Sequence, residues 1–189
     1  MISKTSRQLI ILHIFLSSKV IEMIDMTNLL KISNKTIMRD ISELQQAGVV
    51  RVYYSRNENG YVHLHDQNRS PFLEPVFSDN QAQNRHLEKL RRLAAIMTGL
   101  RGHFEYPYDD ERAKDQETCS AWYQQRFPTM SGRTMQRDFA ELNKIGYEIK
   151  YERAEKCYTV DFPEGLEGIE QGVEEKLDSL FGKKQEKVR

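Results

Sequence analysis

The sequence predicts a mainly α protein with small β-hairpins, an α+β fold built from two similar domains. The first observation behind this prediction is an internal repeat, because the stretch 33–64 recurs in altered form at 131–162. Self-similarity of this kind sets the architecture of a chain. The second is the order of local signals, which in both copies predicts a helix, a glycine stop and a hairpin. Identical pairs are Ser33/Ser131, Thr36/Thr134, Arg39/Arg137, Asp40/Asp138, Glu43/Glu141, Leu44/Leu142, Gly48/Gly146 and Tyr53/Tyr151 at a constant offset, then Tyr61/Tyr158 after one deleted residue.

Each copy carries the start and stop signals of a helix. Ser33 or Ser131 can cap the first turn, because its hydroxyl oxygen can accept a bond from a free backbone N–H. Gly48 or Gly146 can take the left-handed conformation that ends the helix. The β-branched and aromatic residues that follow, a polar turn and a second apolar run predict a hairpin. The residues on the inner helical face are Ile37, Ile41 and Leu44 in the first copy and Met135, Phe139 and Leu142 in the second.

This order, with shorter helices upstream, is the layout of a winged helix-turn-helix, in which the helix after the turn enters the DNA major groove. The pattern S-x-[KR]-T-[IM]-x-R-D-[IF]-x-E-L-x-x-x-G at 33–48 and 131–146 resembles the recognition helix of DeoR-type regulators, also found at the N-terminus of WYL-domain regulators. The resemblance implies tandem winged helix-turn-helix domains, DNA binding and transcriptional control. The chain has no room for the large sensor domain of WYL regulators, so their effector site is not expected here.

With 189 residues, the chain accommodates two small domains. We expect a first winged helix-turn-helix domain at 1–66 and a second at 81–163. Residues 67–80 contain no helical period but are apolar, which predicts a linker that packs along a domain surface. Residues 164–189 are expected to form an amphipathic helix and a tail. The apolar face of that helix contains Ile169, Val173, Leu177, Leu180 and Phe181.

The first domain is expected to begin with a helix from Thr5 to Ser17. This helix is apolar around most of its circumference, so it must be buried widely, either under the first domain or also against a partner subunit. Thr27 is expected to cap a short helix at 28–32. The hairpin is predicted within 49–64, and Asn59-Gly60 is a strong turn pair at its tip.

The second domain is expected to begin with a helix at 83–100 that corresponds to the first helix of the other copy. Residues 101–118 are an insertion relative to the first copy, and their polar second part should be exposed. Thr118 can cap the helix that follows. In the second hairpin Ile149 stands where the first copy has Arg51, so either Arg51 points outward near DNA or the strand register differs.

The outward positions of the two repeated helices are the candidate DNA-binding residues. Lys35 and Arg39 can reach phosphates or guanine edges, Asn34 can reach an adenine edge, and Thr36 can reach a phosphate or a thymine methyl. Wing side chains can reach the DNA backbone or minor groove, although ordinary exposed turn charges stay an alternative there. The candidates are Asn34, Lys35, Thr36, Met38, Arg39, Arg51, Arg56 and Asn57 in the first domain, and Gly132, Arg133, Thr134, Gln136, Arg137, Arg153 and Lys156 in the second.

The two helices are not expected to read the same bases. Gly132 in place of Asn34 removes a base-reading side chain, whereas Gln136 in place of Met38 adds one. Residues 1–66 carry eight basic and six acidic side chains. We therefore expect the first domain to dominate DNA affinity.

Some repeated residues are given structural interpretations. Asp40 and Asp138 would repel phosphate from a DNA-facing position, so each is expected to orient the neighbouring arginine or to bond to another helix. The repeated tyrosines are interpreted as hairpin core rather than as base-stacking platforms. One of the adjacent Trp122 and Tyr123 is expected to pack inside.

Composition bounds the remaining classes of function. A net charge of zero counts against indiscriminate coating of DNA, and no apolar run is long enough to span a membrane. Cys119 and Cys157 have no paired spacing, which indicates a reducing cytoplasm without a disulfide framework. The histidines are scattered, and neither a glycine-rich phosphate loop nor a nucleophile elbow occurs. We therefore expect a cytoplasmic protein that is not an enzyme, needs no cofactor or metal and binds double-stranded DNA, with homodimerisation as a hypothesis.

Two alternatives stay open. A plasmid or phage replication initiator also can use paired winged helices on repeated sites, and only genomic context separates it from a transcriptional regulator. A non-DNA adaptor would use winged helices to bind protein. Its outward helix positions should be neutral or acidic, and in this sequence they are basic, which favours DNA.

Overall fold

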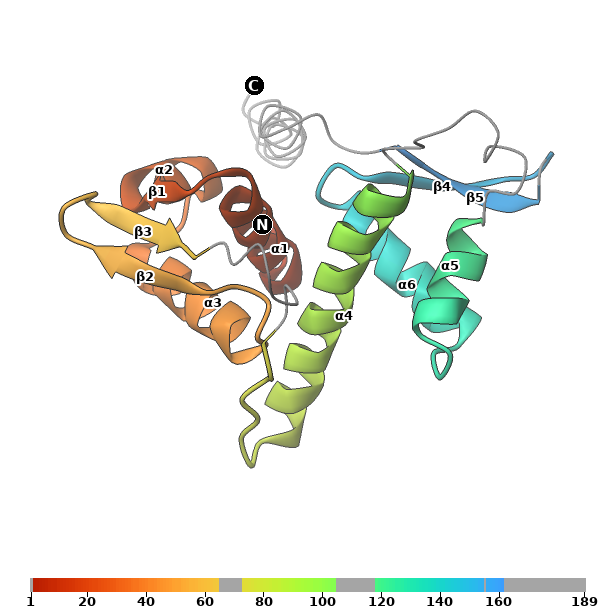
Figure 1. Cartoon of the computed structure of the whole chain (residues 1–189), viewed down its shortest axis with the longest axis horizontal. Helices are drawn as coiled ribbons and strands as arrows, with labels where there is room; N and C mark the ends of the chain where they lie inside the picture. The colour runs from red at the N-terminus through yellow and green to blue at the C-terminus, as the bar shows by residue number, and fades with distance from the viewer. Residues whose placement is uncertain (1, 65–72, 105–117, 155, 162–189) are drawn as a thin grey trace, which may run out of the picture. The chain divides into compact units, whose positions relative to one another are not determined.

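The structure is a computed structural model of the chain that describes residues 2–64, 73–104, 118–154 and 156–161. These ranges form helices and small antiparallel sheets, which confirms the predicted α+β fold class (Figure 1). The chain divides into two compact units, and we call residues 2–94 the first unit and the part from Ala95 onward the second unit. Within the described ranges, no helix combines the length and apolar character needed to cross a membrane.

The first unit has three helices and a three-stranded sheet before the start of a long fourth helix. In the sheet β3 lies between the other two strands and is antiparallel to both. Helix α4 continues past Ala94 into the second unit. The elements are α1 (Lys4–Ser17), β1 (Val20–Glu22), α2 (Met23–Leu30), α3 (Asn34–Gln46), β2 (Val52–Ser55), β3 (Gly60–His63) and α4 (Gln81–Phe104).

Helix α1 forms the centre of the first unit. Ser3 caps it by accepting a bond from the backbone N–H of Ser6. Every residue from Leu9 to Phe15 is buried, and the helix packs against α3 and β1. The ring of Phe15 also contacts the rings of two β3 residues. The apolar circumference of α1 is therefore buried within the chain, and Leu16 alone among its apolar residues is exposed.

Helix α2 differs from the sequence prediction. It begins at Met23, so Thr27 lies inside the helix and donates its hydroxyl hydrogen to the Ile24 carbonyl oxygen. The prediction of a helix at 28–32 capped by Thr27 was wrong. The reason is the short strand β1, which pairs with β3 about forty residues away and leads directly into α2. A pairing that distant leaves no signal in the local pattern.

In the second unit, the described residues form the end of α4, two further helices and a two-stranded sheet. Thr118 caps α5 by accepting a bond from the Ala121 backbone N–H, as predicted. Trp122 and Tyr123 are both buried. The ring of Trp122 lies so close to Gly99 of α4 that a Cβ atom at Gly99 would overlap it. The elements after α4 are α5 (Cys119–Arg126), α6 (Gly132–Asn143), β4 (Glu148–Glu152) and β5 (Cys157–Asp161).

The described part of the predicted linker runs along the first unit. The Leu73 backbone N–H donates to the Gly48 carbonyl oxygen at 2.8 Å, and the Val76 N–H donates to the Gln46 carbonyl oxygen at 2.7 Å. Arg91 of α4 donates to the carbonyl oxygens of Ala47 and Leu73. These bonds hold residues 73–76 against the end of α3 within the first unit. The other linker residues, the polar part of the insertion and the predicted C-terminal helix lie outside the described residues.

Candidate nucleic-acid interface

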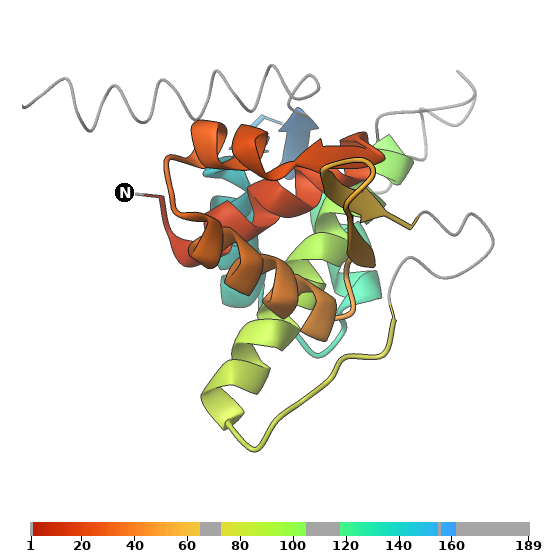
Figure 2. The ribbon, with the colours of Figure 1, turned by 90° about the vertical axis from the view of Figure 1, so that its left-hand side faces the viewer.

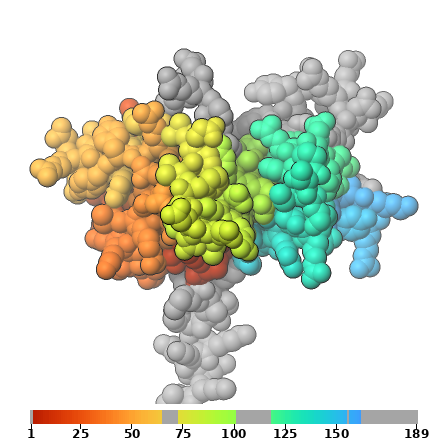
Figure 3. All heavy atoms as spheres, turned by 90° about the horizontal axis from the view of Figure 1, so that it is seen from below, coloured from red at the N-terminus to blue at the C-terminus, as the bar shows by residue number. Residues whose placement is uncertain are grey.

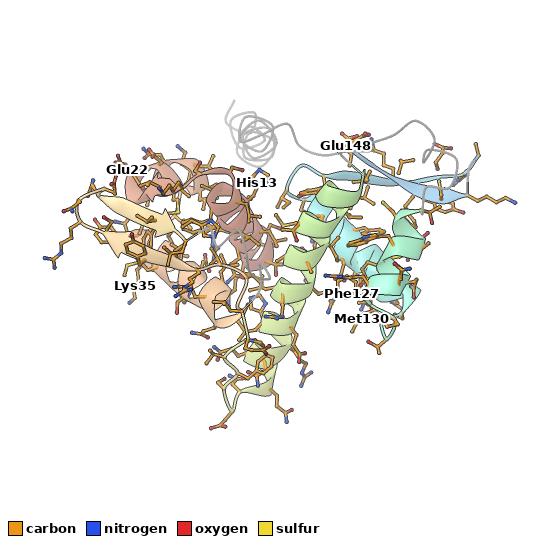
Figure 4. All side chains as sticks on the ribbon, viewed as in Figure 1. His13, Glu22, Lys35, Phe127, Met130 and Glu148 are labelled. Carbon is orange, nitrogen blue, oxygen red and sulfur yellow. The ribbon has the colours of Figure 1, made fainter. Side chains whose placement is uncertain are left out.

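Helix α3 presents the outward residues predicted at its start. Ser33 Oγ accepts a bond from the Thr36 backbone N–H at 3.3 Å and lies 3.0 Å from Thr36 Oγ1, so both hydroxyls belong to the cap. Ile37 and Ile41 are buried, which turns the opposite side of the helix outward. Lys35 lies at the amino-terminal end of α3 (Figure 4). The exposed candidates on α3 are Asn34, Lys35, Met38 and Arg39, and Thr36 is half-buried.

Helix α6 has the same construction in the second unit. Ser131 Oγ accepts a bond from the Thr134 N–H at 3.2 Å and lies 3.0 Å from Thr134 Oγ1. Met135 and Phe139 are buried. Open space surrounds the position that a Cβ atom would take at Gly132. The exposed candidates on α6 are Gly132, Arg133, Gln136 and Arg137, and Thr134 is half-buried.

The starts of both helices are positively charged. Neither first turn contains an acidic residue. Lys35, Arg39, Arg133 and Arg137 form no ion pair with any side chain that the structure describes. The unsatisfied backbone N–H groups of a helix start also favour an anion. The geometry therefore suits contact with phosphate groups at the start of each helix.

The hairpin turns hold the wing candidates. Arg56 and Asn57 are exposed in the turn between β2 and β3, and Arg153 and Lys156 are exposed in the turn between β4 and β5. The space-filling view in Figure 3 shows α3 and the hairpin β2–β3 (orange to yellow-orange) at the surface of the first unit. Arg51, just before β2, is exposed as well.

Strand pairing explains the mismatch between Arg51 and Ile149. Tyr54 pairs with Tyr61 across β2 and β3, and Tyr151 pairs with Tyr158 across β4 and β5. In this register Val52 is equivalent to Ile149, and both side chains are buried, with exposed fractions of 6% and 4%. The residue that the second copy lacks is therefore one of those between Gly48 and β2 in the first copy. Arg51 instead matches Glu148, which is exposed and labelled in Figure 4.

The interpretation of the repeated tyrosines as hairpin core was wrong for Tyr53 and Tyr151. Their exposed fractions are 50% and 52%, although Val52 and Ile149 on the same strands are buried, so each strand buries its early residue and exposes its tyrosine. The alignment of Tyr53 with Tyr151 was also wrong. In the corrected register the position equivalent to Tyr151 is Tyr54, because Tyr54 pairs with Tyr61 as Tyr151 pairs with Tyr158. Tyr61 and Tyr158 are half-buried against phenylalanine rings of α1 and α6.

Comparison with known proteins addresses the first unit. Residues 7–65 match the DeoR-like helix-turn-helix domain. The match covers roughly a third of the chain and includes α3 and the hairpin β2–β3. No curated protein and no solved structure matches the chain. The DeoR-like domain supports the resemblance drawn from the motif at 33–48 and, at a coarse level, a DNA-binding regulator.

A buried carboxylate anchors α3 within the region that matches the DeoR-like domain. Asp40 has no exposed surface, and it accepts bonds from Arg7 Nε at 2.5 Å, Arg7 Nη2 at 3.2 Å and Gln8 Nε2 at 3.4 Å. Both donors come from α1, which packs against α3 (Figure 2). In the second unit Asp138 is also buried and accepts a 2.7 Å bond from the Tyr123 hydroxyl of α5. Each aspartate thus bonds to another helix, one of its two predicted roles.

Glu43 extends this network to α4. Lys4 Nζ and Gln8 Nε2 donate to its carboxylate at 2.8 Å and 2.6 Å. Because Gln8 uses its amide nitrogen for the carboxylates, its Oε1 accepts the 2.9 Å bond from His86 Nε2. Burial lowers the pKa of His86, and the charge of Lys4 adds to that effect. Burial raises the pKa of Glu43, but the bonds from Lys4 and Gln8 outweigh burial and leave this pKa below its ordinary value.

Proposed function

We propose that this chain is a sequence-specific regulator of transcription that binds double-stranded DNA through two winged-helix domains. The observation that carries the proposal is the repeated helix start, in which a serine cap precedes exposed cations that have no ion pair in the described part of the chain. These cations are Lys35 and Arg39 on α3 and Arg133 and Arg137 on α6.

The support differs between the two units. The first unit has the match to the DeoR-like domain. The second unit has the same sequence of features, namely a capped helix, a buried aspartate on its inner side and a hairpin with an equivalent tyrosine pair. We assign the second unit the same kind of DNA contact on this geometric ground.

In the proposed complex the start of each helix lies in the major groove. Lys35 and Arg39 contact phosphates or guanine edges, Asn34 contacts an adenine edge, and the exposed side chain of Met38 contacts a thymine methyl. In the second unit Gln136 takes over base contact, and Gly132 lets the helix start approach the backbone closely. The wing residues Arg51, Arg56, Asn57, Arg153 and Lys156 contact the sugar-phosphate backbone or the minor groove.

The proposal involves no catalytic step and no cofactor, because every assigned contact is a hydrogen bond, a charge contact or an apolar contact to DNA. We place its action in the cytoplasm, a location that the unpaired spacing of Cys119 and Cys157 also favours. Homodimerisation stays a hypothesis supported by the apolar pattern at 164–189, since the apolar face of α1 is already buried. A mass in solution that corresponds to a monomer at every concentration would exclude a dimer.

The test is selection of bound sequences from a random duplex pool at about physiological salt, where non-specific attraction is weak. We expect one or two enriched motifs, whose spacing shows whether both units engage. The double variant Lys35→Gln/Arg39→Gln should lose enrichment, whereas the control Arg85→Gln, an exposed cation on α4, should keep it. Absence of enrichment for the wild-type chain, with binding lost as salt rises, would point to the adaptor alternative.

A further inference from the structure

A side-chain amide near the end of each DNA-facing helix bonds to the first strand of the hairpin that follows. In the first unit Gln45 Nε2 donates to the Val52 carbonyl oxygen at 2.9 Å. In the second unit Asn143 Nδ2 donates to the Ile149 carbonyl oxygen at 3.0 Å, and Asn143 Oδ1 accepts a bond from the Ile149 backbone N–H at 2.8 Å. The two amides occupy aligned positions of the repeat, and their two strand partners are equivalent in the strand register.

These bonds satisfy backbone groups at one residue on an edge strand of each sheet, the Val52 carbonyl in the first unit and both backbone groups of Ile149 in the second. Among the strands that the structure describes, β2 and β4 each have a neighbour on one side only. An edge strand presents backbone N–H and C=O groups without a partner strand. The side-chain amide of Asn143 offers the same donor and acceptor pair as a peptide group, so it takes the place of the missing strand at Ile149.

The two versions of this contact compensate for a difference in chain length. Gln45 and Val52 are seven residues apart, whereas Asn143 and Ile149 are six residues apart. The longer glutamine side chain thus accompanies the longer connection, and the shorter asparagine accompanies the connection that lacks one residue. Both copies of the repeat thus form the contact despite their different lengths, which indicates a role that the two hairpins share.

We propose that Gln45 and Asn143 are positioning residues that hold each wing in a fixed orientation to its DNA-facing helix. This inference rests on the proposed function. Both residues lie near the helix end opposite to the base-reading positions, so neither contacts bases itself. Their bonds let the wing cations and the helix cations reach phosphates of the same duplex segment without a further loss of conformational freedom on binding.

The first part of the test needs no DNA. In Asn143→Leu the amide hydrogen of Ile149 should exchange about tenfold faster in the folded protein, because its acceptor is gone. The matched control is Gln124→Leu, an exposed residue of α5 without a hydrogen bond in the described part of the chain. Asn143→Ala serves if the leucine variant does not fold. Unchanged exchange at Ile149 in the variant would overturn the proposal.

The second part measures DNA binding on the sequences selected with the wild-type chain. Asn143→Leu should weaken DNA binding by about threefold to tenfold. The slope of log affinity against log salt should decrease by the amount expected for the loss of about one to two phosphate contacts. When Arg153→Gln and Lys156→Gln are added to Asn143→Leu, DNA affinity should decrease only slightly further. A wing without a fixed orientation no longer holds its cations close to phosphates. Gln45→Leu combined with Arg56→Gln provides the same cycle in the first unit.

The outcomes separate the two proposals. Additive losses, with faster exchange at Ile149, would restrict the amide to local stability and overturn the positioning role while DNA binding stands. A wild-type chain that binds no duplex would refute the proposed function, and the positioning role would fall with it.

Discussion

Arg39 and Asp40 are neighbours in the repeated motif but lie on different sides of α3. Arg39 is exposed, whereas Asp40 is buried and bonded to Arg7 and Gln8 of α1. Successive residues of an α-helix point about 100° apart, so one step along the motif separates an exposed cation from a buried structural anion. The carboxylate thereby fixes α3 to α1 on the side of the helix away from Arg39.

Removal of this carboxylate should destabilise the first unit strongly. In Asp40→Ala the Arg7 guanidinium, which is mostly buried, would lose its ionic partner. Breaking such a pair costs about 3–5 kcal/mol. Urea unfolding of the chain measures this loss. The control Ser42→Ala, an exposed position on the same helix, should change the free energy of unfolding by about 0.5 kcal/mol or less, and similar values for both variants would contradict the anchoring role.

Charge-neutralising variants should affect the two helices unequally. We expect Lys35→Gln/Arg39→Gln to lower DNA affinity and its salt dependence more than Arg133→Gln/Arg137→Gln. The cations Arg51 and Arg56 accompany the first pair, whereas β4 beside the second pair exposes two glutamates, and one of them already pairs with Lys150. Affinity measured at several salt concentrations tests this asymmetry. Equal losses from the two double variants would refute it.

Gly48 lies at the point where the end of α3, the linker and α4 come together. It has a φ of +70°, and a Cβ atom there would overlap the Leu73 carbonyl oxygen and the Arg91 guanidinium. That carbonyl oxygen accepts a bond from Arg91, which also bonds to the end of α3 at Ala47. The glycine is therefore required by its backbone conformation and by the close approach of the linker.

The same substitution at two glycines should have different consequences for stability. Gly48→Ala should destabilise the chain by about 1–3 kcal/mol, because it adds backbone strain and displaces the linker. Gly132→Ala should be neutral or stabilise by up to about 1 kcal/mol, since Gly132 has open space around it and lies in a helix. Thermal and urea unfolding of both variants provide the comparison. Equal effects would show that the contact at Leu73 does not constrain Gly48.

Helices α3 and α6 were predictable because their signals are local. A serine cap, an apolar face and a glycine stop all act within a few turns, so the sequence also predicts which side of each helix is exposed. Ser33, Ile37 and Gly48 behave as their types and spacing indicate. The exposed candidate residues on both helices follow from the same periodicity.

The errors and omissions come from contacts between distant segments. Strand β1 and the early start of α2 depend on pairing with β3, and the place of the deleted residue depends on pairing within each hairpin. Sequence alone also left out Gln45 and Asn143 as bonding partners of the strands, and His86 as a partner of Gln8. An amide or an imidazole on a helix face gives no local sign of the backbone or side chain that it will meet.

The first unit as a whole should lose stability in acid because of its polar network at α1, α3 and α4. The charged groups that act on His86 are Lys4, Glu43, Lys89 and Asp40. The pKa of His86 is lower in the folded chain than its ordinary value of 6.5, so the unfolded chain binds more protons as the pH falls below that value. The pKa of Glu43 is also lowered, from 4.5, and shifts stability in the same direction at lower pH.

Stability from His86 should therefore be complete above about pH 6.5 and decrease as the pH falls towards its folded pKa. We expect the urea midpoint of the wild-type chain to decrease between about pH 7.5 and about pH 5.5, a range in which Glu43 stays ionised. In His86→Gln the new amide can still donate to Gln8 Oε1 but cannot titrate, so the decrease should be smaller. The same decrease in both proteins would show that His86 binds protons equally well in the folded and the unfolded chain. Its bond to Gln8 would then not hold the imidazole neutral.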